Sequence, residues 1–159
     1  MVDIDGVVRV TAPVLLSKNY VDAYVRKHGA WIYKRQQQAS QRNIIKVPKK
    51  DIPVLKEKTA RIIKDRLGYF AAQYGYSYKK VSIRDQKTRW GSCSRSGNLN
   101  FNYKIALLPE KLIDYIVIHE LCHLKELNHS KNFWNLVARA CPEHLLLRKE
   151  LRRTHIVTR

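Results

Sequence analysis

The sequence predicts an α+β fold in which a small antiparallel sheet packs on one central helix, with further helices around it. Segments in which apolar residues recur at helical spacing outnumber the segments that alternate as strands. Two of the alternating segments lie just before the most apolar helical segment. The length of 159 residues, with 45% hydrophobic and 28% charged residues, fits one globular core. Together these observations indicate the α+β class.

The N-terminal part is predicted to contain a strand, a helix and a linker. Residues 6–13 alternate as a strand that Pro13 ends, and Ser17 is a candidate N-cap for a helix over 19–38. Gly29 can interrupt that helix. The polar, basic segment 40–53 contains two prolines and is predicted to be a linker. We therefore expect an N-terminal strand–helix piece over residues 1–45 and a main domain over residues 46–159.

The main domain is predicted to be helix, strand, loop, strand and three helices in that order. These are a helix over 54–74 ended by Gly75, a strand over 79–86, a turn-rich loop over 87–98, a strand over 99–107, a helix from Pro109 through Leu127, a helix over 131–141 capped by Ser130, and a helix opened by Pro142. This order places the two strands next to the central helix.

The charge and the cysteines limit the class of protein. Thirty-one Lys and Arg residues against 13 Asp and Glu residues give a net charge of +18, which suits a polyanionic partner such as nucleic acid or merely a solubilising surface. The three cysteines share no C-x-x-C spacing, which indicates free thiols in a reducing compartment. No apolar run is long enough for a bilayer and no signal pattern opens the chain, so we expect a cytoplasmic protein without a membrane partner.

The stretch "IVIHELCHLKELNHS", residues 116–130, contains the strongest chemical signal. His119 and His123 are four residues apart on the predicted helix, so both imidazoles can reach one metal ion. Glu120 lies about 100° around the helix from His119 and can approach a water on that metal. This is the His-Glu-x-x-His pattern, in which zinc acidifies a water molecule and the glutamate takes the proton. We expect one Zn²⁺ per chain with Glu120 as the catalytic residue.

A catalytic zinc site needs a third protein ligand, and His129 is the candidate. It follows the helix by a short segment, and Asn128 suits the turn that would bring it back. The alternative is that any one of these histidines is a buried structural residue. His28, His144 and His155 are expected at the surface, and Cys122 and Cys141 are expected to pack in the core.

Several segments together resemble the YgjP-like metallopeptidase-type domain, a zincin family related more distantly to the SprT-like and WLM zincins. They are "RWGSCS", "NLNFNYKIALLP" and "IDYIVIHELCHLKELNHSKNFW", within a match that is dense from residue 79 to 151. The resemblance implies a zincin-like fold, zinc ligands at His119, His123 and His129, and Glu120 as general base. Relative to that family, the N-terminal piece is reduced and lacks a β-hairpin after its first helix.

The substrate stays open at this point. A metallopeptidase is the first interpretation, because "NLNFNYKIA" could offer an edge strand to an extended peptide. A metal-dependent nucleoside triphosphate (UTP) pyrophosphatase is the second, and a nucleic-acid-associated SprT-like protease is the third. A pure binding module with structural zinc is disfavoured, because such a site gains nothing from Glu120.

The basic residues before the zinc motif bear on this choice. Lys87, Arg89, Arg84 and Arg95 are candidate substrate- or phosphate-binding residues, or equally a solvated basic strand and loop. Trp90, Trp134 and Asn100 are expected to form the wall of the site.

Overall fold

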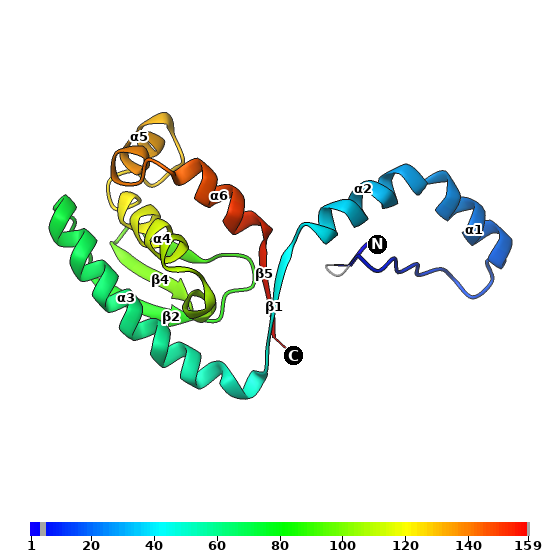
Figure 1. Ribbon diagram of the computed structural model, residues 1–159, viewed down its shortest axis with the longest axis horizontal. Coiled ribbons are helices and arrows are strands. Elements are labelled where there is room, and N and C mark those ends of the chain that lie inside the picture. The colour runs from blue at the N-terminus through cyan, green and yellow to red at the C-terminus, as the bar shows by residue number, and fades with distance from the viewer. Residues whose placement is uncertain (4–5, 159) are drawn as a thin grey trace. The chain divides into compact units, whose positions relative to one another are not determined.

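The computed structural model describes residues 1–3 and 6–158 and is shown in Figure 1. The chain divides into two compact units. The first comprises Met1–Ile44 with Arg153–His155, and the second comprises Ile45–Arg152 with Ile156–Arg159. The second unit contains the His-Glu-x-x-His segment.

The structure contains both helices and strands, as expected for the α+β class. The helices are α1 (Lys18–Lys27), α2 (Gly29–Ser40), α3 (Ile52–Tyr74), α4 (Glu110–Cys122), α5 (Lys131–Ala140) and α6 (His144–Arg153). The strands are β1 (Asn43–Val47), β2 (Lys80–Arg84), β3 (Gly91–Cys93), β4 (Asn98–Asn102) and β5 (Thr154–Thr158), and short 3-10 helices cover Lys49–Asp51 and Tyr103–Leu107. No helix among the described residues is both long and apolar enough to span a bilayer.

In the first unit the helices form as predicted and the strand does not. The side chain of Ser17 accepts a hydrogen bond from the Tyr20 N–H and caps α1. The helical segment breaks at His28, just before Gly29. The predicted strand over 6–13 is wrong for its described residues, which pair only through an isolated bridge between Val2 and Val8. An alternating segment becomes a strand only where a partner supplies the ladder of hydrogen bonds.

The main sheet is mixed rather than antiparallel. Its order is β2-β4-β3, with β2 parallel to β4 and β3 antiparallel to β4. The segment expected to offer an edge strand, β4, is therefore the central strand. The loop predicted over 87–98 contains the edge strand β3. Three residues are too few for a periodic signal, so the sequence pattern does not show this strand.

Two further boundaries differ from the prediction. The linker predicted over 40–53 contains β1, which pairs with β5 in a two-stranded sheet, and it also contains a 3-10 helix. Helix α4 ends at Cys122 instead of Leu127, and residues 123–125 form a turn. This early end matters for the site because it redirects the chain immediately after the second histidine.

The core of the second unit lies between the sheet and two helices, α3 and α4 (Figure 1). Leu99 and Phe101 on β4 are fully buried against Ile63 and Leu67 of α3 and against Val117 of α4. Burying such side chains contributes about 1.5–3 kcal/mol each. The core therefore fixes α4, which carries the candidate site, against the central strand.

Polar contacts fix α3 to its neighbours at two points. The Arg66 guanidinium on α3 binds both oxygens of Asp114 on α4. The fully buried Thr59 hydroxyl donates to the Tyr103 carbonyl at 2.6 Å. At its C-terminal end α3 stops at Gly75, whose φ of 65° is the left-handed conformation that a glycine adopts without steric cost.

Candidate metal centre

Helix α4 places the first two histidines on one side, one turn apart. The ring centroids of His119 and His123 are 4.9 Å apart. His119 lies in the last turn of the helix, and His123 is its C-cap residue. The His123 Nδ1 lies 2.9 Å from the Glu126 carbonyl, in the turn that follows. A proton on that nitrogen is donated to the carbonyl, so Nε2 is the ring atom left to accept a metal.

A tight turn and a helix cap bring the third histidine back. The Asn128 side chain accepts a hydrogen bond from the Ser130 N–H at 3.1 Å, and the Ser130 hydroxyl accepts from the Phe133 N–H at 3.3 Å. His129 lies between these two contacts. Its Nε2 is 3.1 Å from the Nε2 of His119. The predicted capping role of Ser130 is confirmed.

The three histidines fit a tetrahedral metal ion. One ligand atom from each of His119, His123 and His129 lies within 4.8 Å of the others. Two nitrogens bound to zinc at about 2.0–2.1 Å in a tetrahedron are about 3.3 Å apart, close to the separation of the His119 and His129 nitrogens. Three imidazoles that leave one position open are typical of a catalytic zinc site.

The protonation of the histidines also suits a metal. Burial lowers the pKa of His119 to about 3, with the neighbouring His123 and His129 as further causes. Burial also lowers the pKa values of His123 and His129. At neutral pH all three rings therefore keep a lone pair, which is the form that binds metal.

Aromatic side chains of α5 support the three rings from one side. The fully buried Phe133 contacts all three, with ring centroids 4.9, 4.4 and 4.8 Å from those of His119, His123 and His129. The Trp134 indole stacks on His129 at 5.6 Å. These contacts limit the rotation of each imidazole and hold the cluster together.

Glu120 is buried between α4 and the edge strand. Only 5% of its surface is exposed, and its Oε2 has no hydrogen-bond partner among the described residues. Burial raises the pKa of the Glu120 carboxyl to about 8, and the Arg89 charge opposes this. A Cβ added at Gly91 of β3 would lie 2.6 Å from the Glu120 Oε1. The strand can therefore pass this close to the carboxyl only because residue 91 is a glycine.

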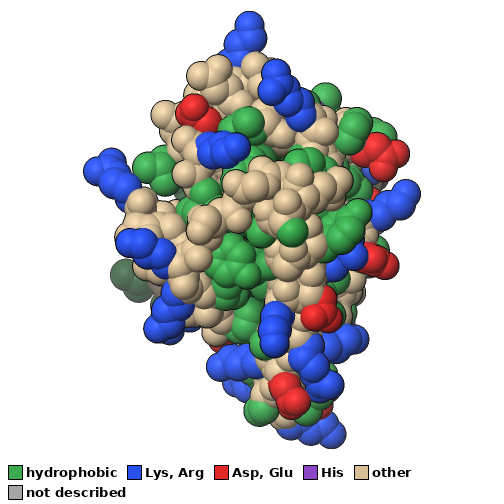
Figure 2. Space-filling view, turned by 90° about the vertical axis from the view of Figure 1, so that its left-hand side faces the viewer, with side chains coloured by type: hydrophobic (Ala, Val, Ile, Leu, Met, Phe, Trp, Pro, Cys, Tyr) green, Lys and Arg blue, Asp and Glu red, His purple; other side chains and the backbone are tan. Residues whose placement is uncertain are grey.

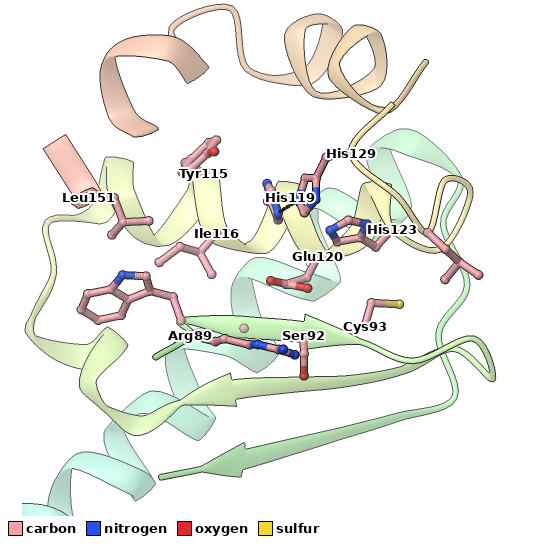
Figure 3. A pocket seen from close by; sticks show the side chains of 13 residues that line it. Arg89, Ser92, Cys93, Tyr115, Ile116, His119, Glu120, His123, His129 and Leu151 are labelled. Atoms are coloured by element: carbon pink, nitrogen blue, oxygen red, sulfur yellow. Dashed lines mark hydrogen bonds between the residues drawn. The ribbon is translucent and has the colours of Figure 1, made fainter. Parts of the chain in front are cut away.

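The side chains surround a cavity of about 510 Å³. Its walls are the segment 89–93, the α4 residues that include Tyr115, the three histidines with Glu120, and the apolar Leu127 and Leu151. Figure 3 shows the rings of His119, His123 and His129 close together and the Glu120 carboxyl between α4 and β3. The cavity joins a candidate metal site, a carboxyl group and an edge strand.

The structure brings only some of the predicted site residues to this cavity. Arg89 and Trp90 line it, whereas Lys87, Arg84 and Arg95 do not. Arg84 ends β2, which forms the opposite edge of the sheet. Asn100 does not line the cavity, but its side chain donates to the hydroxyl of Ser92, which does, at 3.3 Å. Trp134 does not line the cavity either, but its indole stacks on the His129 ring.

Sequence reasoning missed several residues of the site. Gly91 could have been found, because a glycine inside a strand often marks a close approach of the backbone. Tyr115 gave no signal apart from its apolar position; burial raises the pKa of its phenol to about 12. Arg148 on α6, whose guanidinium lies 4.4 Å from the Trp134 ring centre, gave none.

His144 was predicted at the surface, and that is wrong. It is 9% exposed, and its ring stacks on Trp134 with the ring centroids 6.0 Å apart. The reason is local, because the His144 Nδ1 lies 3.1 Å from the Cys141 carbonyl at the end of α5, and the ring lies against Trp134 of the same helix. Cys122, predicted to pack in the core, is fully buried as a free thiol.

Known proteins resemble the second half and the middle of the chain. A family model described as YgjP-like, metallopeptidase domain, matches residues 46–154. No curated protein shows significant similarity to the chain.

Solved structures are also similar to this chain, among them two metallopeptidase zymogens. The metallopeptidase zymogen of Pyrococcus abyssi abylysin shares 30% identity over 60% of this chain and 99% of its own, with a TM-score of 0.47. The metallopeptidase zymogen of Methanocaldococcus jannaschii jannalysin shares 25% identity over 58% of this chain and 95% of its own, with a TM-score of 0.41. On the family match, which covers more than half of its residues, the chain belongs to the YgjP-like metallopeptidase domain family.

Proposed function

We propose that the chain is a zinc-dependent peptidase in which His119, His123 and His129 hold the metal and Glu120 is the general base. The observation that carries the proposal is the convergence of three neutral imidazoles beside one buried carboxyl group. The membership in a metallopeptidase family supports the same conclusion. All four residues lie within the matched segment. We also retain the proposal that residues 46–159 form the hydrolase domain and residues 1–45 a separate piece.

In this proposal zinc supplies the Lewis acid that makes a water molecule acidic at neutral pH. The positive charge of a bound metal ion would favour the ionised form of the buried Glu120 carboxyl, which would then accept the proton of the attacking water and deliver it to the leaving amine. Its Oε2, which has no partner among the described residues, is the atom available for that water. Gly91 and the surrounding core keep the carboxyl in place and limit the access of bulk water.

The edge strand β3 is the proposed binding surface for the peptide backbone. It is the terminal strand of the sheet and forms one wall of the cavity. An extended peptide can add to such an edge through main-chain hydrogen bonds, which bring a peptide bond beside the metal without requiring a particular sequence. This replaces β4, which the sequence suggested and which lies in the centre of the sheet.

The two alternative functions receive less support. A triphosphate needs several cations around the metal, and of the four basic candidates only Arg89 lines the cavity. Lys and Arg side chains are spread over the face drawn in Figure 2, and Asp and Glu side chains are fewer there. This distribution fits a generally basic surface. The three free cysteines agree with a cytoplasmic protein.

The test combines metal content and turnover in one preparation. We expect about one zinc per chain and cleavage of a random peptide library detected by mass spectrometry. Glu120→Gln should retain zinc and lose at least about 100-fold in rate, since a general base contributes about 10²–10⁴-fold. Phosphate or pyrophosphate release from UTP is measured on the same sample. Zinc-loaded protein that hydrolyses UTP and no peptide would reverse the order of the two hypotheses.

A further inference from the structure

The two charged side chains that line the cavity differ in how exposed they are to an entering substrate. Among the lining side chains, Glu120 carries the one carboxyl group and Arg89 the one guanidinium. The Glu120 carboxyl is buried at the base of the cavity, whereas the Arg89 side chain is exposed. The histidines are neutral when they are free to bind metal. A substrate that enters therefore meets a positive charge first.

Arg89 has no carboxylate partner of its own in the part of the chain that the structure describes. Arg66, by contrast, pairs with both Asp114 and Glu110. Glu120, the one carboxyl among the side chains that line the cavity, does not form an ion pair with Arg89. An exposed guanidinium keeps its five donors in a fixed fork, which matches a carboxylate with two parallel hydrogen bonds.

The backbone that carries Arg89 is held in place. The buried Asn102 amide donates to the carbonyls of Gln86 and Arg89 at 2.6 and 2.9 Å. The Asn102 N–H donates to the Trp90 carbonyl at 2.8 Å. In Figure 3 the Arg89 side chain runs along β3 toward Ser92, below Glu120. The guanidinium is thus presented beside the edge strand at which we place the peptide.

A second cation acts on the site from α6. The half-buried Arg148 lies over the Trp134 ring, which stacks on His129. A second guanidinium therefore lies close to the candidate metal site, with the Trp134 indole between it and His129.

We infer that this peptidase selects substrates with a carboxylate next to the cleaved bond, and that Arg89 binds this carboxylate. The inference rests on the proposed peptidase function and names its substrate class. The carboxylate can come from an Asp or Glu side chain or from the C-terminus of a peptide. Arg89 is in this assignment a specificity-determining residue, and Glu120 alone remains the base.

The test uses internally quenched peptides that are identical except for one residue beside the cleaved bond, which is Glu, Gln or Lys. These three peptides have an amidated C-terminus. A fourth peptide has Gln at the same position and a free C-terminal carboxylate beside the cleaved bond. We compare wild type with Arg89→Ala and Arg89→Lys. Arg139→Ala is the matched control, since Arg139 is exposed on α5 and does not line the cavity.

For the wild type we expect kcat/KM to be about 10- to 100-fold higher on the Glu peptide than on the Gln peptide, because a hydrogen bond to a charged group contributes about 1.5–3 kcal/mol. Arg89→Ala should abolish this ratio mainly through KM, Arg89→Lys should keep part of it, and Arg139→Ala should keep all of it. The fourth peptide tells whether a C-terminal carboxylate serves as well as a side chain.

Two results would overturn the inference. One is a wild type that cleaves the Glu and Gln peptides equally. The other is an equal loss of kcat on both peptides in Arg89→Ala, which would make Arg89 a positioning residue for Glu120. Binding of fluorescein-labelled Glu and Gln peptides to zinc-loaded Glu120→Gln protein gives the same comparison without turnover. Failure of the peptidase function itself shows separately, as zinc-loaded wild type that cleaves no peptide.

Discussion

Substituting Gly91 by alanine tests whether the edge strand holds the general base in position. The added Cβ would lie 2.6, 2.7 and 2.8 Å from the Oε1, Cγ and Cδ atoms of Glu120. Ordinary van der Waals contact begins near 3.4 Å, so the carboxyl or the strand must move by roughly 1 Å. Both are packed, because Glu120 is 5% exposed and β3 is paired with β4. Such overpacking costs about 1–3 kcal/mol of stability.

The effect on turnover should exceed the effect on folding. Misplacing a catalytic group by about 1 Å can lower the rate by about 100-fold. We therefore expect Gly91→Ala to bind zinc, to melt a few degrees lower than wild type and to lose about two orders of magnitude in kcat on a peptide. The assays are zinc content, thermal unfolding and cleavage of a quenched peptide at saturating concentration.

Gly68 supplies the matched control for this substitution. It lies inside α3, and an added Cβ there would meet nothing within 4 Å. Gly68→Ala should stabilise the protein by about 0.5–1 kcal/mol and leave kcat unchanged. Near-wild-type turnover in Gly91→Ala would refute the reasoning, because it would show that Glu120 either tolerates displacement or is not the base.

Three further predictions follow from the same geometry. His129→Ala should lower zinc affinity by more than about 100-fold, measured by competition with a chelator, since loss of a mere outer-shell partner already costs about 10- to 100-fold; unchanged affinity would remove His129 from the ligand set. Asn102→Ala leaves the Gln86 and Arg89 carbonyls without their donor and should lower the free energy of unfolding by about 1–3 kcal/mol in a urea titration, with an unchanged midpoint as the contrary result. The pKa of His119 falls from 6.5 to about 3 on folding, so that only the unfolded chain takes up a proton in this range. Between pH 6.5 and 4.5 the raised pKa of Glu120 opposes this effect, because the native carboxyl is then protonated and the unfolded one is not. Metal-free protein should therefore lose stability through His119 as pH drops from about 4.5 toward 3, and a melting temperature that stays flat in this lower window would contradict the burial of a neutral ring.

The elements with strong local signals were predictable, and those that depend on pairing were not. Ser17 and Ser130 act as the caps that their sequence context suggested, and Gly75 ends α3. The strand β3 and the two-stranded sheet of β1 and β5 escaped prediction. The three residues of β3 are too few to show a period, although their partner β4 follows closely in the chain. The strands β1 and β5 lie near opposite ends of the chain, and single-sequence periodicity contains no information about such distant partners.

The candidate site shows the same division between local and long-range information. The spacing of His119 and His123 follows from helix geometry, and the sequence therefore indicated them directly. Gly91 is next to Glu120 because strand and helix pack face to face, 29 positions apart in the chain. The basic residues illustrate the opposite case: Arg84, Lys87 and Arg89 are close in sequence, yet only Arg89 lines the cavity. Proximity along a strand and its loop does not bring side chains to one place.

Phe133 connects the metal centre with the folding core. It is fully buried among the core residues, and its ring contacts His119, His123 and His129 at centroid distances below 5 Å. The first two rings come from α4, whose position the sheet and α3 determine, while the third comes from the turn before α5. The third imidazole can join the other two only when α5 has docked on α4. The sequence pairs the turn residue His129 with an aromatic residue four positions later, so that the packing step that buries Phe133 also completes the ligand set.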